Sequence, residues 1–252
     1  MTAARPYAEK IETLFKTAVS RISPAELRHP LLEKRPTKRV ALVIFSSDRG
    51  LCGSYNTNIL KLGLAQARHW QEQGVEPRML LIGLKATQFF KSVGLPVITH
   101  YTHLPATPTF GVAQEIVDHL TCEFETKAVD KVVLVFTRFV NMLTYKPSLL
   151  ELLPVEAPAA AADHRHASYL FEPSAEAVIS AVLPKYLEMQ VYRAFLEANA
   201  SELAARMTAM SAATKNASEM VQALTLVYNK ARQSSITQEI LEVVSGAEAL
   251  RG

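Results

Sequence analysis

The chain has 252 residues, of which 49% are hydrophobic and 20% are charged, and its formal net charge is +3. This composition excludes a mainly disordered chain, and the small positive charge, spread along the sequence, argues against a protein that binds nucleic acid. The two cysteines, Cys52 and Cys122, exclude a disulfide framework, lack the spacing of metal ligands and suggest a reducing compartment.

Residues 1–37 are expected to form an N-terminal helical remnant. A helix with one apolar face is predicted over residues 6–22, and Pro24, Pro30 and Pro36 interrupt any continuation. No apolar run in the chain approaches the ~20 residues of a membrane-spanning helix, so direct membrane insertion is not expected.

Residues 38–154 are predicted to form a Rossmann-like α/β domain. Short apolar segments rich in β-branched residues alternate there with amphipathic helical segments. Strands are predicted over residues 39–45, 78–82, 95–98 and 131–136, and helices over residues 55–73, 84–93 and 110–128. Residues 138–153 are expected to add an edge strand or a hairpin. The alternation indicates an α/β fold with a largely parallel sheet.

The loop after the first strand, SSDRGLCGSYN at residues 46–56, raises the question of a phosphate site. A strand, a glycine-bearing loop and a helix N-terminus in this order can bind an anion through free backbone N–H groups. The glycine spacing, however, matches neither a P-loop nor the G-x-G-x-x-G fingerprint. In addition, no acidic residue follows about twenty positions later to bind a ribose.

We therefore favour a structural turn at this loop. Gly50 and Gly53 are expected to supply unusual backbone angles, and Cys52 is expected to be a small buried residue. Ser54 or Asn56 is expected to cap the helix that follows.

No catalytic residue, cofactor or metal ligand is predicted in the chain. Asp48 and Arg49 are adjacent in a turn, where such a pair is expected to be a surface ion pair. Cys52 has no histidine that the sequence positions to activate it as a nucleophile.

The last third of the chain has a different character. Residues 155–172 form a low-complexity linker that contains APAAAADHRHAS, and residues 173–252 are predicted to form a long shaft helix. Residues 185–245 contain neither glycine nor proline and are dominated by strong helix formers, which predicts a continuous helix about 90 Å long at 1.5 Å per residue. Glu202 and Arg206 are expected to form an i,i+4 ion pair.

An apolar seam runs along the predicted helix. Its members recur at steps of three and four, interrupted at Thr214: Leu203, Met207, Met210, Ala217, Val221, Leu224, Tyr228 and Ala231. This spacing is typical of a coiled coil, so the helix is expected to pair with another helix or to enter a cavity of a partner.

Four segments of the chain resemble the gamma subunit of F-type ATP synthases. They are SSDRGLCGSYNTNI, SELAARMTAMSAATKNA, LTLVYNKARQSSITQEILEVVSGAEAL at residues 224–250, and AARPYAEKI near the N-terminus. The match runs in order over essentially the whole sequence.

The resemblance implies a central-stalk rotor subunit. In the family, a coiled coil of the C-terminal and N-terminal helices penetrates a hexamer of alpha and beta subunits, and the α/β domain contacts the epsilon subunit and the membrane ring of c subunits. Rotation then couples ion flow to ATP synthesis or hydrolysis in the hexamer. The implied location is peripheral, on the cytoplasmic or stromal face of an energy-transducing membrane. Arg232, Gln233 and Thr237 match family positions that contact an acidic loop of beta.

Two departures from the family leave questions open. The family's N-terminal shaft helix is missing before Ala3, so a misplaced start, a fragment and a shortened paralogue all remain possible. The linker of residues 155–168 lacks cysteine, so a thiol switch is not predicted. Alternatives to the rotor are a small α/β nucleotide-binding enzyme that uses the loop of residues 48–56, and a free-standing coiled-coil scaffold.

Overall fold

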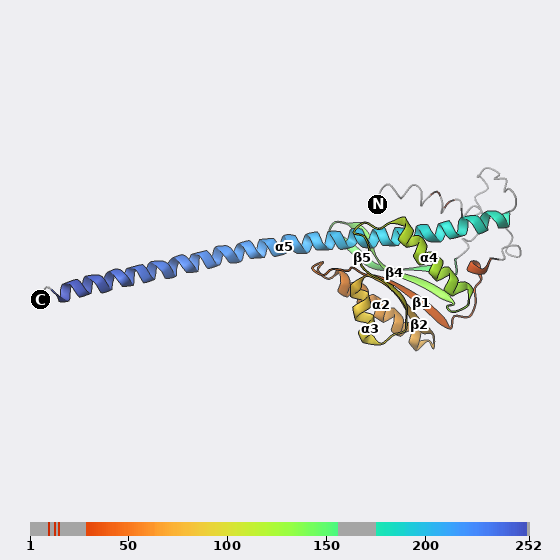
Figure 1. Ribbon diagram of the computed structural model, residues 1–252, viewed down its shortest axis with the longest axis horizontal. Coiled ribbons are helices and arrows are strands. Elements are labelled where there is room, and N and C mark those ends of the chain that lie inside the picture. The colour runs from red at the N-terminus through yellow and green to blue at the C-terminus, as the bar shows by residue number, and fades with distance from the viewer. Residues whose placement is uncertain (1–9, 11–12, 14, 16–28, 156–174, 251–252) are drawn as a thin grey trace. The chain divides into compact units, whose positions relative to one another are not determined.

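The structure is a computed structural model and describes residues 10, 13, 15, 29–155 and 175–250 (Figure 1). The described residues divide into two units, one up to Arg206 and one from Met207. Most of the predicted N-terminal remnant and most of the linker lie outside the described residues. The described elements are η1 (Pro30–Leu32), β1 (Arg39–Phe45), α2 (Tyr55–Glu72), β2 (Glu76–Ile82), α3 (Leu84–Val93), β3 (Val97–Tyr101), α4 (Phe110–Glu125), β4 (Lys131–Asn141), β5 (Thr144–Leu153) and α5 (Ala175–Ala249).

The first unit contains a five-stranded sheet with the order β3-β2-β1-β4-β5. The pairs β1–β2, β1–β4 and β2–β3 are parallel, whereas β5 pairs antiparallel with β4. The α/β fold with a largely parallel sheet is therefore confirmed. The segment after residue 137 makes a hairpin because β4 continues to Asn141 before the chain reverses.

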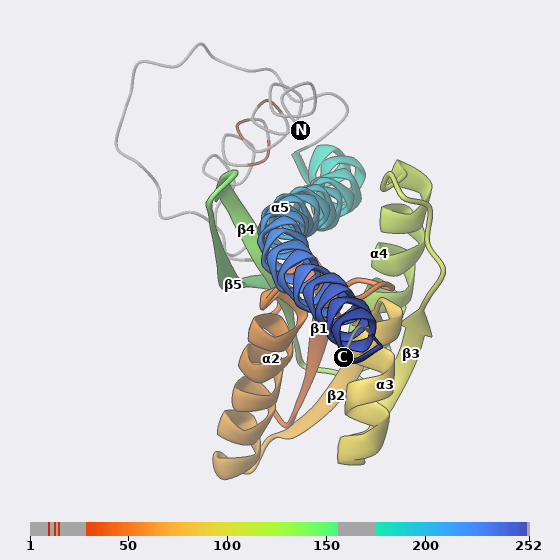
Figure 2. The same ribbon diagram turned by 90° about the vertical axis from the view of Figure 1, so that its left-hand side faces the viewer.

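Helices cover both faces of the sheet, as Figure 2 shows. Alternate residues of a strand point to opposite faces, so Val40, Leu42 and Ile44 pack with α2 and α3, whereas Val43 and Phe45 pack with α4 and the first part of α5. Six of the seven β1 residues are buried, which explains the unbroken apolar run of this strand.

Helix α5 extends beyond the stretch of residues 185–245 that lacks glycine and proline. It begins at Ala175, inside the segment of residues 173–252 expected to form the shaft helix, and carries Pro184 in its interior. Leu183 and Leu187, on either side of the proline, are both fully buried in the core. This burial outweighs the hydrogen bond that Pro184 cannot donate, so the helix continues through it.

The second unit is the remainder of α5, and every residue from 211 to 250 is exposed. The members of the predicted apolar seam from Ala217 to Ala231 are among these exposed side chains, with Val221 at 63% and Leu224 at 61% of full exposure. None of the described helices combines the length and the apolar character needed to cross a membrane.

Candidate functional site

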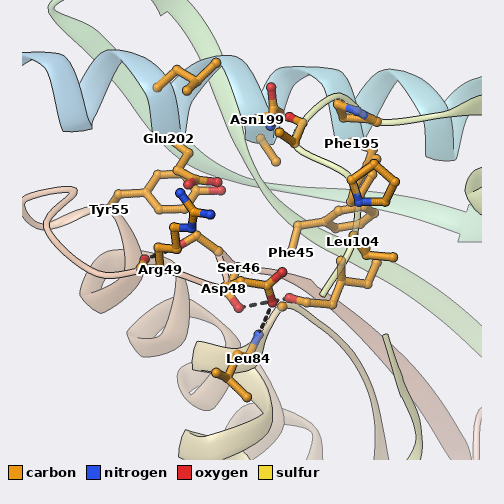
Figure 3. A pocket seen from close by; sticks show the side chains of 18 of the residues that line it. Phe45, Ser46, Asp48, Arg49, Tyr55, Leu84, Leu104, Phe195, Asn199 and Glu202 are labelled. Atoms are coloured by element: carbon orange, nitrogen blue, oxygen red, sulfur yellow. Dashed lines mark hydrogen bonds between the residues drawn. The ribbon is translucent and has the colours of Figure 1, made fainter. Parts of the chain in front are cut away.

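A cavity of about 560 Å³ lies at the carboxyl ends of the parallel strands (Figure 3). Its walls come from the loops after β1, β2 and β3 and from residues 195–206 of α5. The carboxyl edge is the place where open α/β sheets bind ligands, and the cavity has the volume of a small-molecule site. The loop that raised the question of a phosphate site forms one of its walls.

The N-terminus of α3, which faces this edge, has its backbone donors occupied by the chain itself. Leu84 N donates to Asp48 Oδ1 at 2.8 Å, and Ala86 N donates to Ser46 Oγ at 2.9 Å. Lys85 N donates to the carbonyl oxygen of Ser47 at 3.1 Å. These three N–H groups are therefore not free to bind a phosphate at the N-terminus of α3. The predicted Asp48–Arg49 ion pair is wrong because Asp48 caps α3.

Gly83 makes this tight arrangement possible. Its φ is +91°, and a Cβ at this position would lie 2.4 Å from the carbonyl oxygen of Ser46. A side chain here would force β1 and β2 apart at the point where Asp48 reaches α3.

The loop at residues 46–56 is a structural turn in which different residues take the expected roles. The residues of this loop with a positive φ are Leu51 at 62° and Gly53 at 56°, whereas Gly50 has none. Asn56 does not cap α2. Its side chain accepts from Ser47 N at 3.1 Å and donates to Ser47 Oγ at 2.8 Å, which closes the loop onto the end of β1.

Cys52 and Tyr55 lie beneath the loop, each only 2% exposed, and pack against Ala205 of α5. Burial, followed by the charge of Glu202 and the proximity of Cys52, raises the pKa of Tyr55 well above its usual range. The phenol is therefore neutral at every physiological pH. As predicted, Cys52 is a small buried residue, and its environment is that of a packing side chain rather than of a nucleophile.

The polar side chains that α5 contributes to the cavity also bind within the protein. Glu202 and Arg206 form the predicted i,i+4 pair at 2.8 Å. Arg206 also donates to the carbonyl oxygen of Gly50 at 3.4 Å, and Asn199 Nδ2 donates to that of Ala106 at 3.0 Å. The sequence analysis missed these residues as part of the cavity, because helical spacing alone does not show which loop a helix crosses.

The residues predicted to contact a partner lie elsewhere. Arg232, Gln233 and Thr237 are all exposed on α5 within the second unit. Thr237 Oγ1 donates to the carbonyl oxygen of Gln233 at 2.8 Å, so this hydroxyl is satisfied within the helix. The described residues contain no cluster of three His, Cys, Asp or Glu side chains that could bind a metal ion.

Comparison with known proteins identifies the family. A family described as ATP synthase matches residues 1–250. The ATP synthase gamma chain of Desulfitobacterium hafniense is 41% identical over 251 residues, which cover 98% of this chain and 85% of the relative. That of Heliobacterium modesticaldum is 44% identical over 254 residues, with coverage of 98% and 86%. The chain belongs to the ATP synthase gamma chain family.

The fold of the gamma chain family extends to distant solved structures. A chain from the mitochondrial ATP synthase of Euglena gracilis (OSCP/F1/c-ring) superposes with a TM-score of 0.65 at 19% identity, covering 99% of this chain and 91% of that one. A chain from the central stalk and c-ring of the Tetrahymena thermophila mitochondrial enzyme gives 0.60 at 22% identity, covering 84% and 96%. At these identities the likeness concerns the fold, which these proteins share with the gamma chain described here.

Proposed function

We propose that this gamma chain is the central-stalk rotor of an F-type ATP synthase, coupling ion translocation through a membrane ring of c subunits to ATP synthesis or hydrolysis in a hexamer of alpha and beta subunits. The observation that carries the proposal is the similarity to ATP synthase gamma chains. Two of them are 41% and 44% identical to this chain in alignments that cover 98% of it. In this proposal the α/β domain contacts the epsilon subunit and the ring, and the chain is peripheral to the cytoplasmic or stromal face of the membrane.

The physical character of α5 supports a mechanical role. Residues 185–245 carry no glycine or proline, so the helix lacks the residues that most often kink or soften it. Between residues 207 and 250, three Lys or Arg side chains stand against four Glu. A rod with nearly balanced charge avoids strong binding at a single angle. It can still shift the populations of its partners through contacts that differ with angle.

The cavity supports a role without catalysis by this chain alone. The backbone donors at the N-terminus of α3, which could otherwise bind a phosphate at this edge of the sheet, bind Asp48, Ser46 and Ser47 instead. ATP would then bind only to the alpha and beta subunits. Calorimetric titration of the isolated chain with ATP and with NAD should give no heat of binding. A stoichiometric signal would favour the alternative of a small nucleotide-binding enzyme.

The direct test is rotation in the assembled complex. Cys122 is exposed on α4 whereas Cys52 is buried, so a thiol-reactive linker attaches a bead selectively to the α/β domain. With the alpha and beta subunits of the same enzyme fixed to a surface, ATP should drive continuous rotation of the bead in one sense. A chain that fails to bind the hexamer, and sediments instead as a stable dimer, would overturn the rotor in favour of a free-standing scaffold.

Arg232, Gln233 and Thr237 are proposed to contact an acidic loop of the beta subunit during rotation. A guanidinium can bind a carboxylate in bidentate fashion, and Arg232 is exposed on α5. Arg232→Gln should lower coupled ATP synthesis about tenfold, the factor that corresponds to a charge-assisted hydrogen bond of ~1.5 kcal/mol. Lys230→Gln, a neighbouring exposed cation, is the matched control and should change it little. Equal losses in both variants would refute a specific contact.

A further inference from the structure

The cavity at the carboxyl edge of the sheet has two unlike halves. Figure 3 shows Phe45, Leu104 and Phe195 on one side of it, and Arg49 and Glu202 on the other. The rings of Phe45 and Phe195 are 5.7 Å apart between their centroids and inclined by 58°, so the apolar half has an aromatic wall. A cavity of about 560 Å³ with this lining suits a small organic molecule that has an apolar body and one polar group.

Hydrogen bonds within the domain hold the walls of this cavity in place. Asn199 Nδ2 donates to the carbonyl oxygen of Ala106 at 3.0 Å, which fixes the loop after β3 to α5. Pro105 and Pro108 restrict the backbone of the same loop. Asp48 likewise fixes the loop after β1 to the N-terminus of α3. The cavity is therefore largely preformed, and binding of a ligand requires little ordering of its walls.

The charges around the cavity favour a cation as the polar group. The side chains with a full charge that line it are Asp48, Arg49, Glu202 and Arg206. Glu202 and Arg206 compensate each other, since their charged atoms are 2.8 Å apart, and Arg49 is exposed to solvent. Asp48 is half-buried and has no ion pair within the described part of the chain. Asp48 therefore offers the cavity a negative charge that no cation of the domain compensates at close range.

The hydrogen-bonding atoms that remain unused lead to the same choice. Among the hydrogen bonds of the described residues, none uses Asp48 Oδ2, Asn199 Oδ1 or Glu202 Oε2, and all three atoms are acceptors. The backbone donors at the N-terminus of α3 are already bound by the protein. A primary ammonium group donates up to three hydrogen bonds and accepts none, so it complements such a lining. A carboxylate would instead be repelled by Asp48.

We propose that this cavity binds a small primary amine with an aromatic ring, with its ammonium group at Asp48 and its ring beside Phe45 and Phe195. Figure 3 shows Asp48 between the two halves of the cavity, where it can reach the polar group of a ligand whose body fills the apolar half. The ring of the ligand packs against the two phenylalanine rings, and the faces of these rings also attract positive charge. This binding site goes beyond the rotor function and does not depend on rotation of the chain.

Calorimetric titration of the full chain with tryptamine tests the proposal, because this probe joins a primary ammonium to an indole ring. Wild type should bind it with one-to-one stoichiometry. Asp48→Asn keeps an oxygen that can accept from Leu84 N but removes the charge, so the dissociation constant should rise about tenfold, the factor of one charge-assisted hydrogen bond. Asp118→Asn removes an exposed carboxylate of α4 outside the cavity and, as the matched control, should leave the constant unchanged. The urea midpoint reported by Trp70 shows whether each variant is folded.

Two analogues of the probe separate the effect of charge from that of shape. Tryptophol carries a hydroxyl group in place of the ammonium and should bind wild type about tenfold more weakly than tryptamine. Indole-3-propionate carries a carboxylate and should give no heat of binding. The proposal is overturned if wild type does not bind tryptamine, if Asp48→Asn binds it as tightly as wild type does, or if indole-3-propionate binds as tightly as tryptamine.

Discussion

Helix α5 joins two regions that differ in environment but little in composition. Residues 175–206 contribute a row of buried side chains to the core of the α/β domain, including Leu187 and Val191 at 0% exposure. Residues 211–250 are exposed throughout, although leucine, valine, isoleucine and methionine are common there as well. Helix propensity and apolar content therefore do not distinguish a buried stretch of helix from an exposed one. Burial against the sheet does.

This difference in burial means that the two regions of α5 contribute differently to the stability of the protein. In the first region, the helix is stabilised by tertiary packing, which is the main source of helix stability in proteins. In the second, it relies on propensity, on continuity with the anchored turns and on weak pairs such as Lys215–Glu219, whose charged atoms are 3.9 Å apart. Substitutions in the first region should change the free energy of unfolding of the domain. Substitutions in the second should change only the torque that the helix transmits in the proposed rotor.

The largest expected contrast comes from truncating one leucine in each region. Leu187→Ala removes a fully buried side chain and should lower the free energy of unfolding by ~2–5 kcal/mol, since a cavity remains in the core. Leu224→Ala removes a side chain that is 61% exposed and should change it by less than ~0.5 kcal/mol. Urea titration of the full chain, followed by tryptophan fluorescence of Trp70, measures both. Similar losses would mean that residues beyond 206 are buried in the isolated chain.

A buried ion pair that holds the segment before β1 provides the second contrast. Asp130 bonds Arg35 Nε at 3.0 Å and accepts from the backbone N–H groups of Lys38 and Arg39 at 2.9 Å. Desolvation alone would raise the pKa of Asp130, but these N–H donors and the Arg35 guanidinium outweigh it and hold the pKa below its usual value. Asp130→Asn should lower the free energy of unfolding by about 2 kcal/mol, because the guanidinium of Arg35 loses its charged partner.

The pH dependence of this cost has a definite sign. A depressed pKa in the folded state contributes stability in full above the ordinary aspartate pKa of 3.8, and loses it as the pH falls through the folded pKa. The difference in unfolding free energy between wild type and Asp130→Asn should thus be constant near neutrality and shrink in acid. Glu219→Gln, which breaks the exposed pair in the second region, should show almost no difference at any pH. If the difference in unfolding free energy between wild type and Asp130→Asn grew as the pH falls, the lowered pKa of Asp130 would be contradicted.

The sequence predicted the fold well because its signals are local and periodic. Runs such as RVALVIF indicate strands buried on both faces, and glycine marks the ends of the first two domain helices. The continuity of α5 through Pro184 could not be read from local pattern, because proline is a local helix breaker, whereas the burial of Leu183 and Leu187 is a tertiary effect. The short strand β3 was expected to start at residue 95, whereas its first residue is Val97, directly after Pro96.

The cavity could be predicted only in part. The loop after β1 was recognised as important, and its glycine spacing argued against a nucleotide fingerprint. The internal occupancy of the α3 amides, however, depends on Asp48 reaching Leu84 across two strands, a contact 36 residues apart in sequence. Likewise, the packing of Ala205 on Tyr55 joins residues that no short-range pattern connects.

The smallest contrast compares two glycines in helices, where the same substitution should change stability in opposite directions. Gly63 of α2 lies against the sheet, and a Cβ there would be 2.8 Å from Ile44 Cδ1 and 3.2 Å from Phe90 Cζ. Gly63→Ala should therefore lower the free energy of unfolding by ~1 kcal/mol, since overpacking exceeds the gain in helix propensity.

Gly246 of α5 has no atom within 4 Å of the position of its missing Cβ among the described residues. Gly246→Ala should therefore stabilise the last turns of the helix by up to ~1 kcal/mol, the propensity difference between the two residues, and raise the helical circular dichroism signal slightly. The urea midpoint reported by Trp70 should not move, because the anchored region unfolds independently of these turns. A shift of that midpoint with Gly246→Ala would show that the two regions of α5 unfold together, and the separation between anchoring and transmission would then fail.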